Sequence, residues 1–207
     1  MQEEKETARI EAFSDGVFAI AITLLVLEIK VPSHEKVLEH GLAYSLFELW
    51  PAYLAFFISF VTILVIWVHH HLIFTQVRKT APPLFYWNGL LLLVVTFVPF
   101  PTGLLAEYLL NPEAKVAASL YTGNFLAISV AFHGLWRYVS KSEGRRIADT
   151  INSKRKVAAR ITRDYRLAPL LYLAAFGISF ISEIAGLSSC LLLAFFYALR
   201  GWPTKEA

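Results

Sequence analysis

Residues 9–29, RIEAFSDGVFAIAITLLVLEI, combine a polar beginning with a long apolar remainder. On a helix with about 100° between residues, Ser14 and Asp15 project away from the aliphatic side chains that follow. A carboxylate within a membrane is costly unless it is paired, so Asp15 needs hydrogen-bond donors on neighbouring helices. The chemistry that this stretch predicts is therefore polar contact between helices.

Four side chains elsewhere in the sequence are suitable partners for Ser14 and Asp15. They are Trp67, His70, His71 and Asn88. Each lies near the same end of an apolar segment as Ser14 and Asp15, and each can donate a hydrogen bond. The sequence leaves open which of the two histidines takes part.

The histidine run at 69–71 also raises the question of a metal site. Adjacent helical residues project about 100° apart, so three histidines in a row do not converge on one ion without distortion of the backbone. No HExxH spacing, nucleophile elbow or Walker-type glycine loop occurs in the sequence. We therefore expect neither an enzyme, nor a cofactor, nor a metal site at the histidines.

A second face of the same stretch is apolar. Within a sector of about 80° lie Arg9, Phe13, Gly16, Ile20, Leu24 and Leu27, with Thr23 at its edge. Taken alone, an aliphatic stripe at this spacing is typical of packing against lipid or a protein core.

The composition predicts an all-α integral membrane protein. Hydrophobic residues make up 57% of the 207 residues and charged residues only 17%. Six apolar segments approach the roughly 20 residues needed to cross a bilayer. They cover about 13–29, 50–74, 84–105, 116–139, 167–183 and 186–200. We expect Pro82 and Pro83 to begin the third helix, and Pro99 and Pro101 to bend or break its far end. The whole chain, 1–207, then forms one six-helix domain.

The distribution of lysine and arginine orients this bundle. With alternating sides, 16 of the 19 basic residues fall on the side of the two termini. The positive-inside rule therefore predicts a multi-pass protein of the cell inner (plasma) membrane with both termini in the cytoplasm. A basic cytoplasmic connection at about 141–166 contributes most of this charge, and we interpret it as a topology determinant rather than a lipid-regulatory or nucleic-acid site.

The signature Arg9-x-x-x-Phe13-Ser14-Asp15, at the head of a six-helix chain, resembles the prokaryotic branch of the transmembrane protein 175 family, the lysosomal potassium channels. The resemblance implies a homotetramer in the lipid bilayer, with the first helix of each subunit around the pore. It also implies a pore without a carbonyl-lined filter, and no such glycine–tyrosine sequence occurs here.

The resemblance further assigns roles to individual residues. It places the pore constriction at Ile20, with later layers at Leu24 and Leu27, and an influence on potassium preference at Thr23. It joins the signature residues to a hydrogen-bond network, which carries over to Arg9, Ser14, Asp15, Trp67, His70 or His71, and Asn88. The implied function is a potassium-permeable cation channel, and a secondary cation or proton transporter is the alternative.

Overall fold

The computed structural model describes residues 2–77, 81–142 and 152–201, with side chains described for 7–77, 81–142 and 162–200. Its elements are α1 (Gln2–Leu24), η1 (Leu25–Glu28), α2 (His34–His40), α3 (Leu42–Glu48), α4 (Trp50–Phe74), α5 (Pro82–Thr96), α6 (Pro99–Tyr108), α7 (Ala114–Ser142), α9 (Asn152–Ser179) and α10 (Glu183–Gly201). Every regular element in this part of the chain is helical, which confirms the all-α prediction.

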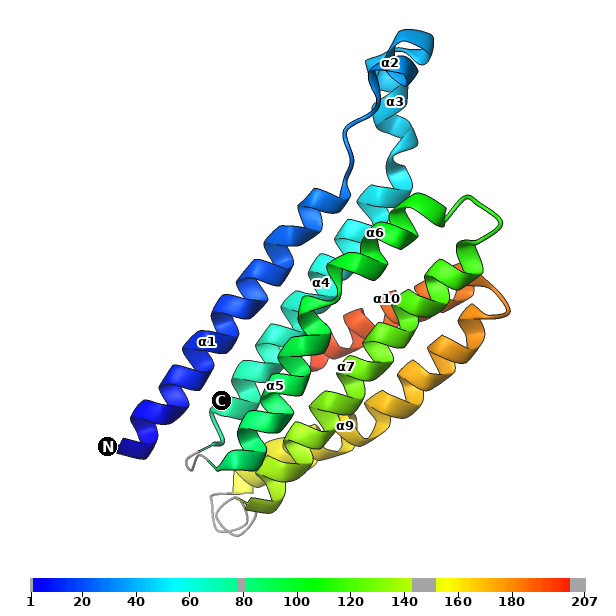
Figure 1. The fold of residues 1–207 in the computed structure, drawn as a ribbon. Helices are drawn as coiled ribbons and strands as arrows, with labels where there is room; N and C mark the ends of the chain where they lie inside the picture. The colour runs from blue at the N-terminus through cyan, green and yellow to red at the C-terminus, as the bar shows by residue number, and fades with distance from the viewer. Residues whose placement is uncertain (1, 78–80, 143–151, 202–207) are drawn as a thin grey trace.

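Five helical stretches among the described residues are long and apolar enough to cross a membrane. They are Thr7–Glu28, Trp50–Phe74, Pro82–Tyr108, Ala114–Ser142 and Glu183–Arg200. Their lengths match the roughly 30 Å hydrocarbon layer, because each residue adds about 1.5 Å to a helix. The chain is therefore a multi-pass membrane protein, and most of its helices run alongside one another in a bundle (Figure 1).

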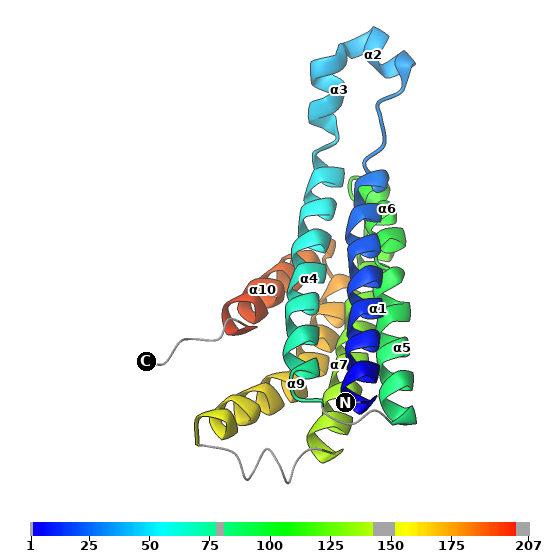
Figure 2. The same cartoon turned by 90° about the vertical axis from the view of Figure 1, so that its left-hand side faces the viewer.

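The span expected at 167–183 forms the second half of α9, and its helix is less apolar than the other five. Arg163, Asp164 and Arg166 precede the apolar part, and the helix ends at Ser179. Pro169 lies inside α9, which changes direction along its length (Figure 2). Of the basic connection expected at 141–166, residues 143–151 lie outside the described part, and the chain is helical from Asn152 onward.

Two pairs of prolines shape the third span as expected. Helix α5 begins at Pro82, where a proline costs no backbone hydrogen bond. It ends at Thr96, and α6 begins at Pro99. Helix α6 continues from α5 toward the end of the bundle opposite the N-terminus (Figure 2).

The turn between α9 and α10 lies a few residues before the expected position. It occupies residues 180–182, and the Ser182 hydroxyl accepts a hydrogen bond from the backbone N–H of Ala185. This bond caps the start of α10. Gly186 then approaches the backbone of Ser179, and a Cβ at Gly186 would lie 2.6 Å from the Ser179 Cβ. Glycine is needed at this close approach.

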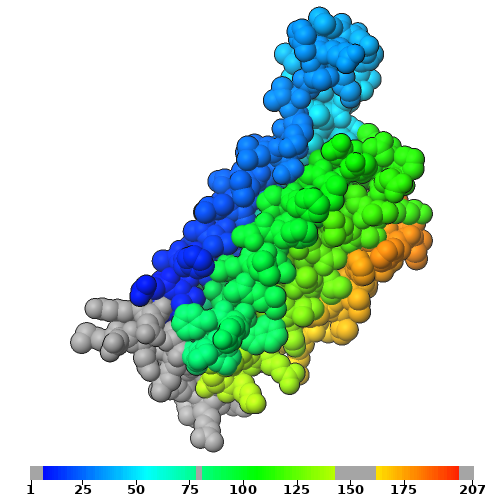
Figure 3. Space-filling view, viewed as in Figure 1, coloured from blue at the N-terminus to red at the C-terminus, as the bar shows by residue number. Residues whose placement is uncertain are grey.

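Between the first two spans, α2 and α3 form a helical hairpin that the hydropathy pattern did not predict. The Ser33 hydroxyl caps α2 by accepting from the backbone N–H of Lys36, and Gly41 turns the chain at φ +82°. The hairpin stands beyond the bundle at the end opposite the N-terminus (Figures 1 and 3). Each helix has only seven residues, too few to produce a recognisable apolar period.

Helix α7 lies at the centre of the fold and α1 at its edge. Helix α7 packs against α5, α6, α9 and α10, and its Tyr121, Phe125 and Leu135 are fully or almost fully buried. Helix α1 packs mainly against α4 and α5, and it runs along one side of the molecule (Figure 3). One side of α1 is consequently left uncovered by its own chain.

The packing of α5 on α7 leads to a stability prediction. A Cβ at Gly134 of α7 would overlap the six-membered ring of Trp87 on α5. We expect Gly134→Ala to push this ring out of place and cost about 1–3 kcal/mol, because an overpacked contact must shift side chains or backbone. Thermal melting of the purified protein in detergent measures the effect. Gly177→Ala on α9, where a Cβ meets open space, is the matched control. Equal melting temperatures for the two variants would contradict the prediction.

Candidate pore-lining helix

Helix α1 and η1 divide into two faces. On one face Phe13, Ile20 and Leu27 are 67%, 58% and 62% exposed, and Arg9, Gly16, Thr23 and Leu24 are exposed beside them. On the opposite face Ser14, Phe18, Ala21 and Leu25 are buried against the rest of the chain. All members of the stripe derived from helical geometry therefore share one uncovered surface, which we call the α1 stripe.

Thr23, at the edge of the α1 stripe, uses its hydroxyl within the helix. Its Oγ1 donates to the carbonyl of Ile20 at 2.9 Å. The donor is thereby occupied, while the hydroxyl lone pairs remain on the exposed side.

Ser14, on the buried face, belongs to a directed chain of hydrogen bonds. Its Oγ donates to the carbonyl of Ile10 at 2.8 Å, and Asn88 Nδ2 donates to Ser14 Oγ at 3.0 Å. Asn88 Oδ1 then accepts from His70 Nε2 at 2.9 Å. This order of donors and acceptors requires a proton on Nε2 of His70. The chain joins α1 to α5 and α4 inside the bundle.

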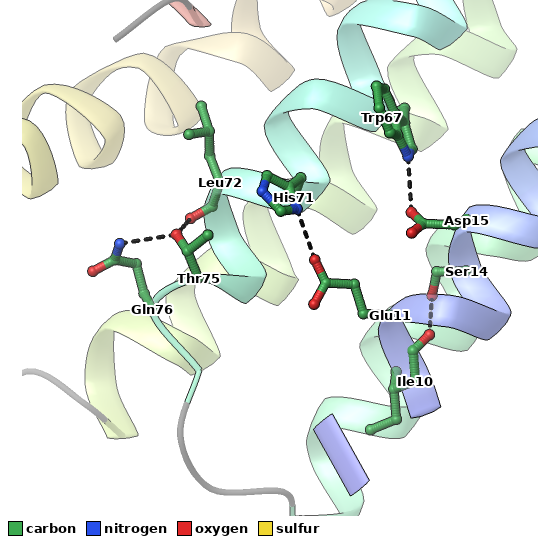
Figure 4. A network of polar contacts seen from close by, with 9 residues as sticks. All are labelled: Ile10, Glu11, Ser14, Asp15, Trp67, His71, Leu72, Thr75 and Gln76. Carbon is green, nitrogen blue, oxygen red and sulfur yellow. Dashed lines mark hydrogen bonds and ion pairs between the residues drawn. The ribbon is translucent and has the colours of Figure 1, made fainter. Parts of the chain in front are cut away.

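Asp15 and Glu11 make a second, more exposed set of contacts with α4 (Figure 4). Trp67 Nε1 donates to Asp15 Oδ1 at 2.8 Å, and Nδ1 of His71 lies 2.7 Å from Glu11 Oε1. Because the two carboxylates are one helical turn apart, both face α4. The carboxylate of Asp15 is thus paired, as its location within a span requires.

The structure separates the roles of the histidines in the run. His70 belongs to the chain with Asn88 and Ser14, whereas His71 contacts Glu11. His69 points elsewhere: its Nδ1 bonds the Tyr165 hydroxyl at 2.8 Å and its Nε2 the carbonyl of Tyr197 at 3.0 Å. Consecutive positions on α4 therefore connect this helix to three different sets of neighbours.

Two residues of the signature lie apart from these contacts. Arg9 is exposed, and no hydrogen bond or ion pair joins it to another residue among those described. Phe13 is exposed on the α1 stripe. The structure brings together Ser14, Asn88 and His70, and separately Asp15 with Trp67, but not Arg9 or Phe13 with either group.

Sequence reasoning missed several polar contacts. Glu11 precedes Asp15 by four residues, and this i, i+4 spacing could have identified it as a second carboxylate facing α4. Asp164 is buried and forms an ion pair with Arg200 of α10. Asp164 lies among many lysines and arginines of the basic connection, and the sequence therefore offered no sign of its role. Among the described side chains of that connection, it is the only buried carboxylate.

The chain is similar in sequence to known ion channels. The family model described as the endosomal/lysosomal potassium channel TMEM175 matches residues 9–99. A potassium channel of Chamaesiphon minutus is 57% identical over 198 residues, which is 96% of this chain and 96% of that protein. A potassium channel of Streptomyces collinus is 41% identical over 206 residues, which is 98% of this chain and 97% of that protein.

A solved structure shows the same fold. It is the crystal structure of a lysosomal potassium-selective channel TMEM175 homolog from Chamaesiphon minutus, with a TM-score of 0.87 and 56% identity. The match covers 95% of this chain and 98% of that chain. Similarity that extends over nearly the whole length places this chain in the TMEM175 family, whose members are ion channels and not enzymes.

Proposed function

We propose that the chain is a potassium-permeable channel in which four copies place their α1 stripes around a common axis. The observation that carries the proposal is the α1 stripe itself. Large aliphatic side chains lie uncovered along one face, while polar contacts hold the opposite face to α4 and α5. One helix cannot enclose a pathway, but a closed ring of identical helices can. The two bacterial relatives are named as potassium channels, which supports the same function.

In this arrangement, rings of Ile20, Leu24 and Leu27 form a narrow apolar neck. An apolar constriction gates by wetting and drying, and its aliphatic side chains offer an ion no oxygen atoms to replace lost water. Potassium holds its hydration shell less strongly than sodium and loses less on entering the neck. Selectivity follows from dehydration at Ile20, and Thr23 adds hydroxyl oxygen beside it.

The polar contacts at the inner end determine how wide this neck is. The contacts of Ser14 and Asp15 with α4 and α5 set the distance of α1 from the axis. Asp15 is therefore a packing residue rather than an ion-binding residue. By the positive-inside rule both termini face the cytoplasm, in the inner membrane of the cell.

Recording from the purified wild-type protein in planar bilayers tests the proposal. We expect discrete current steps and a reversal potential that favours potassium over sodium. Native mass spectrometry of the same sample measures the number of subunits, for which we expect four. Slow, saturable exchange without current steps would instead indicate a secondary transporter. Absence of any potassium flux would reject both functions.

A further inference from the structure

The outer end of the pore-lining segment has its own contact with the bundle. Helix α1 changes into the 3₁₀ helix η1 at Leu25–Glu28, and η1 packs against α6 and α4. Leu25 is completely buried, Leu27 is exposed on the α1 stripe, and the side chain of Glu28 is 25% exposed. Leu27 therefore lies two residues after a buried leucine and directly before a glutamate that is mostly covered.

The Glu28 side chain occupies the space that a side chain at position 103 would take. A Cβ built on Gly103 of α6 would lie 2.9 Å from Cδ and 3.5 Å from Cγ of Glu28, and it would overlap the carboxylate oxygen Oε2. Helix α6 runs beside the outer end of α1 (Figure 2). Among the glycines of the described chain, Gly103 is the one at which a carboxylate fills the missing side chain's place.

The part of α6 that carries Gly103 is firmly attached to two other helices. The hydroxyl of Thr102 lies 2.8 Å from that of Ser59 on α4, and Ser59 lies 2.9 Å from the hydroxyl of Tyr121 on α7. Thr102, Ser59 and Tyr121 are all completely buried. A buried and satisfied hydroxyl cluster fixes one geometry, so the surface that receives Glu28 is rigid.

Lys30 balances the charge of this contact and also caps the helix end. Its Nζ lies 3.9 Å from Glu28 Oε2 and donates to the carbonyl of Leu27 at 3.0 Å. The last carbonyls of a helix have no partner within it, and a lysine near this end satisfies one of them. Glu28, through its contact with α6, and Lys30, through its bond to the Leu27 carbonyl, thus fix the backbone around Leu27.

We infer that the Glu28–Gly103 contact is a positioning device for conduction: the Glu28 carboxylate, fitted against Gly103, sets the place of Leu27 in the outer part of the pore. This inference rests on the proposed channel function. The inner end of α1 is held through Ser14 and Asp15, and the Glu28–Gly103 contact holds the other end. The diameter of the ring of four Leu27 side chains depends on where each of the four helices ends. A small displacement of Leu27 is repeated in all four subunits and therefore changes the pore diameter from four sides.

Electrical recording tests this inference with one disruptive variant and one rescue. Gly103→Ala places a methyl group where the carboxylate lies, and we expect the unitary potassium current to change by at least about threefold, with an altered potassium-to-sodium permeability ratio. Gly103→Ala/Glu28→Asp shortens the acid by one methylene and makes room for the added methyl group, so both quantities should return toward wild type. Gly177→Ala, in open space on α9, controls for the change of glycine itself. Wild-type currents in Gly103→Ala, or failure of the rescue, would overturn the inference.

A cross-linking experiment tests the contact without any ion flux. Cys190 is the only cysteine in the sequence, so Cys190→Ala gives a cysteine-free background. In that background a short bifunctional thiol cross-linker, which spans the reach of the Glu28 side chain, should join the cysteines of Glu28→Cys/Gly103→Cys within one chain in membranes, while those of Glu28→Cys/Gly177→Cys should stay unjoined. Mass analysis of the intact subunit measures the product. Absence of the cross-link in the first pair would overturn the contact.

The two experiments also separate this inference from the proposed function. If the wild-type protein carries no potassium current, the channel function fails. The contact is then decided by the cross-link between positions 28 and 103.

Discussion

Ile20→Asn raises potassium flux through the reconstituted protein by about tenfold or more and lowers the potassium-to-sodium permeability ratio toward that of free solution. The reason is the dehydration barrier, because an amide in each of four subunits offers ions and water polar partners where Ile20 offered none. A tenfold change needs a barrier lower by only about 1.4 kcal/mol, shared among four side chains. Flux into liposomes under a potassium or a sodium gradient measures both effects.

The exposed position of Ile20 makes this experiment clean. Its side chain is 58% exposed in the protomer, so the substitution leaves the packing of α1 on α4 and α5 intact. Ile184→Asn is a matched control, since Ile184 is 67% exposed at the start of α10, away from α1. Flux and selectivity that stay at wild-type values in Ile20→Asn would remove this residue from the neck.

The main features of α1 could be predicted from the sequence because they depend on local periodicity. The stripe from Phe13 to Leu27 follows from the angle between helical residues, and its members share one exposed face. The break at Pro99 follows from the lost backbone donor of proline. Such features need no knowledge of which helices are neighbours.

The partners of the histidines could not be predicted, because they depend on which helices pack against α4. Position alone made His70 and His71 equal candidates for the contact with Ser14. Helix α1 packs against both α4 and α5, and there Asn88 of α5 contacts His70, whereas His69 lies toward α9 and α10. The short hairpin of α2 and α3 escaped prediction for a different reason, since two helices of seven residues carry too little periodic signal.

The boundary of the last two helices shows a third limit. The apolar run continues through the turn at residues 180–182, so hydropathy does not mark the end of α9. What marks it is the capping hydroxyl of Ser182 and the close approach of Gly186 to Ser179. Several serines and glycines nearby offered the same signals, and tertiary packing selected among them.

Asn88→Leu is expected to destabilise the protein far more than Asn124→Leu, although both replace a buried asparagine. The ring of His70 donates from Nε2 to Asn88 Oδ1, and this is its only hydrogen bond among the described residues. The other ring nitrogen, Nδ1, has no partner there. A neutral imidazole carries one N–H, so without Asn88 that donor is unsatisfied on whichever nitrogen it sits. A buried donor left without an acceptor costs about 1–3 kcal/mol. Ser14 also loses the bond from Nδ2 that ties α1 to α5.

The control works because Asn124 lacks such a role. Its Nδ2 on α7 is buried without a partner among the described residues, so replacing the amide by an apolar group of similar size removes an unsatisfied donor. Thermal melting in detergent should therefore show Asn88→Leu lower than wild type by about 5 °C or more, and Asn124→Leu close to wild type or above it. A similar loss in both variants would mean that burial of an amide, rather than the chain from Ser14 to His70, determines the effect. A loss of melting temperature confined to Asn88→Leu would show that the chain of hydrogen bonds from Ser14 to His70 holds this end of α1 in place. In the proposed channel, Ile20 keeps its distance from the axis only if α1 is held in this way.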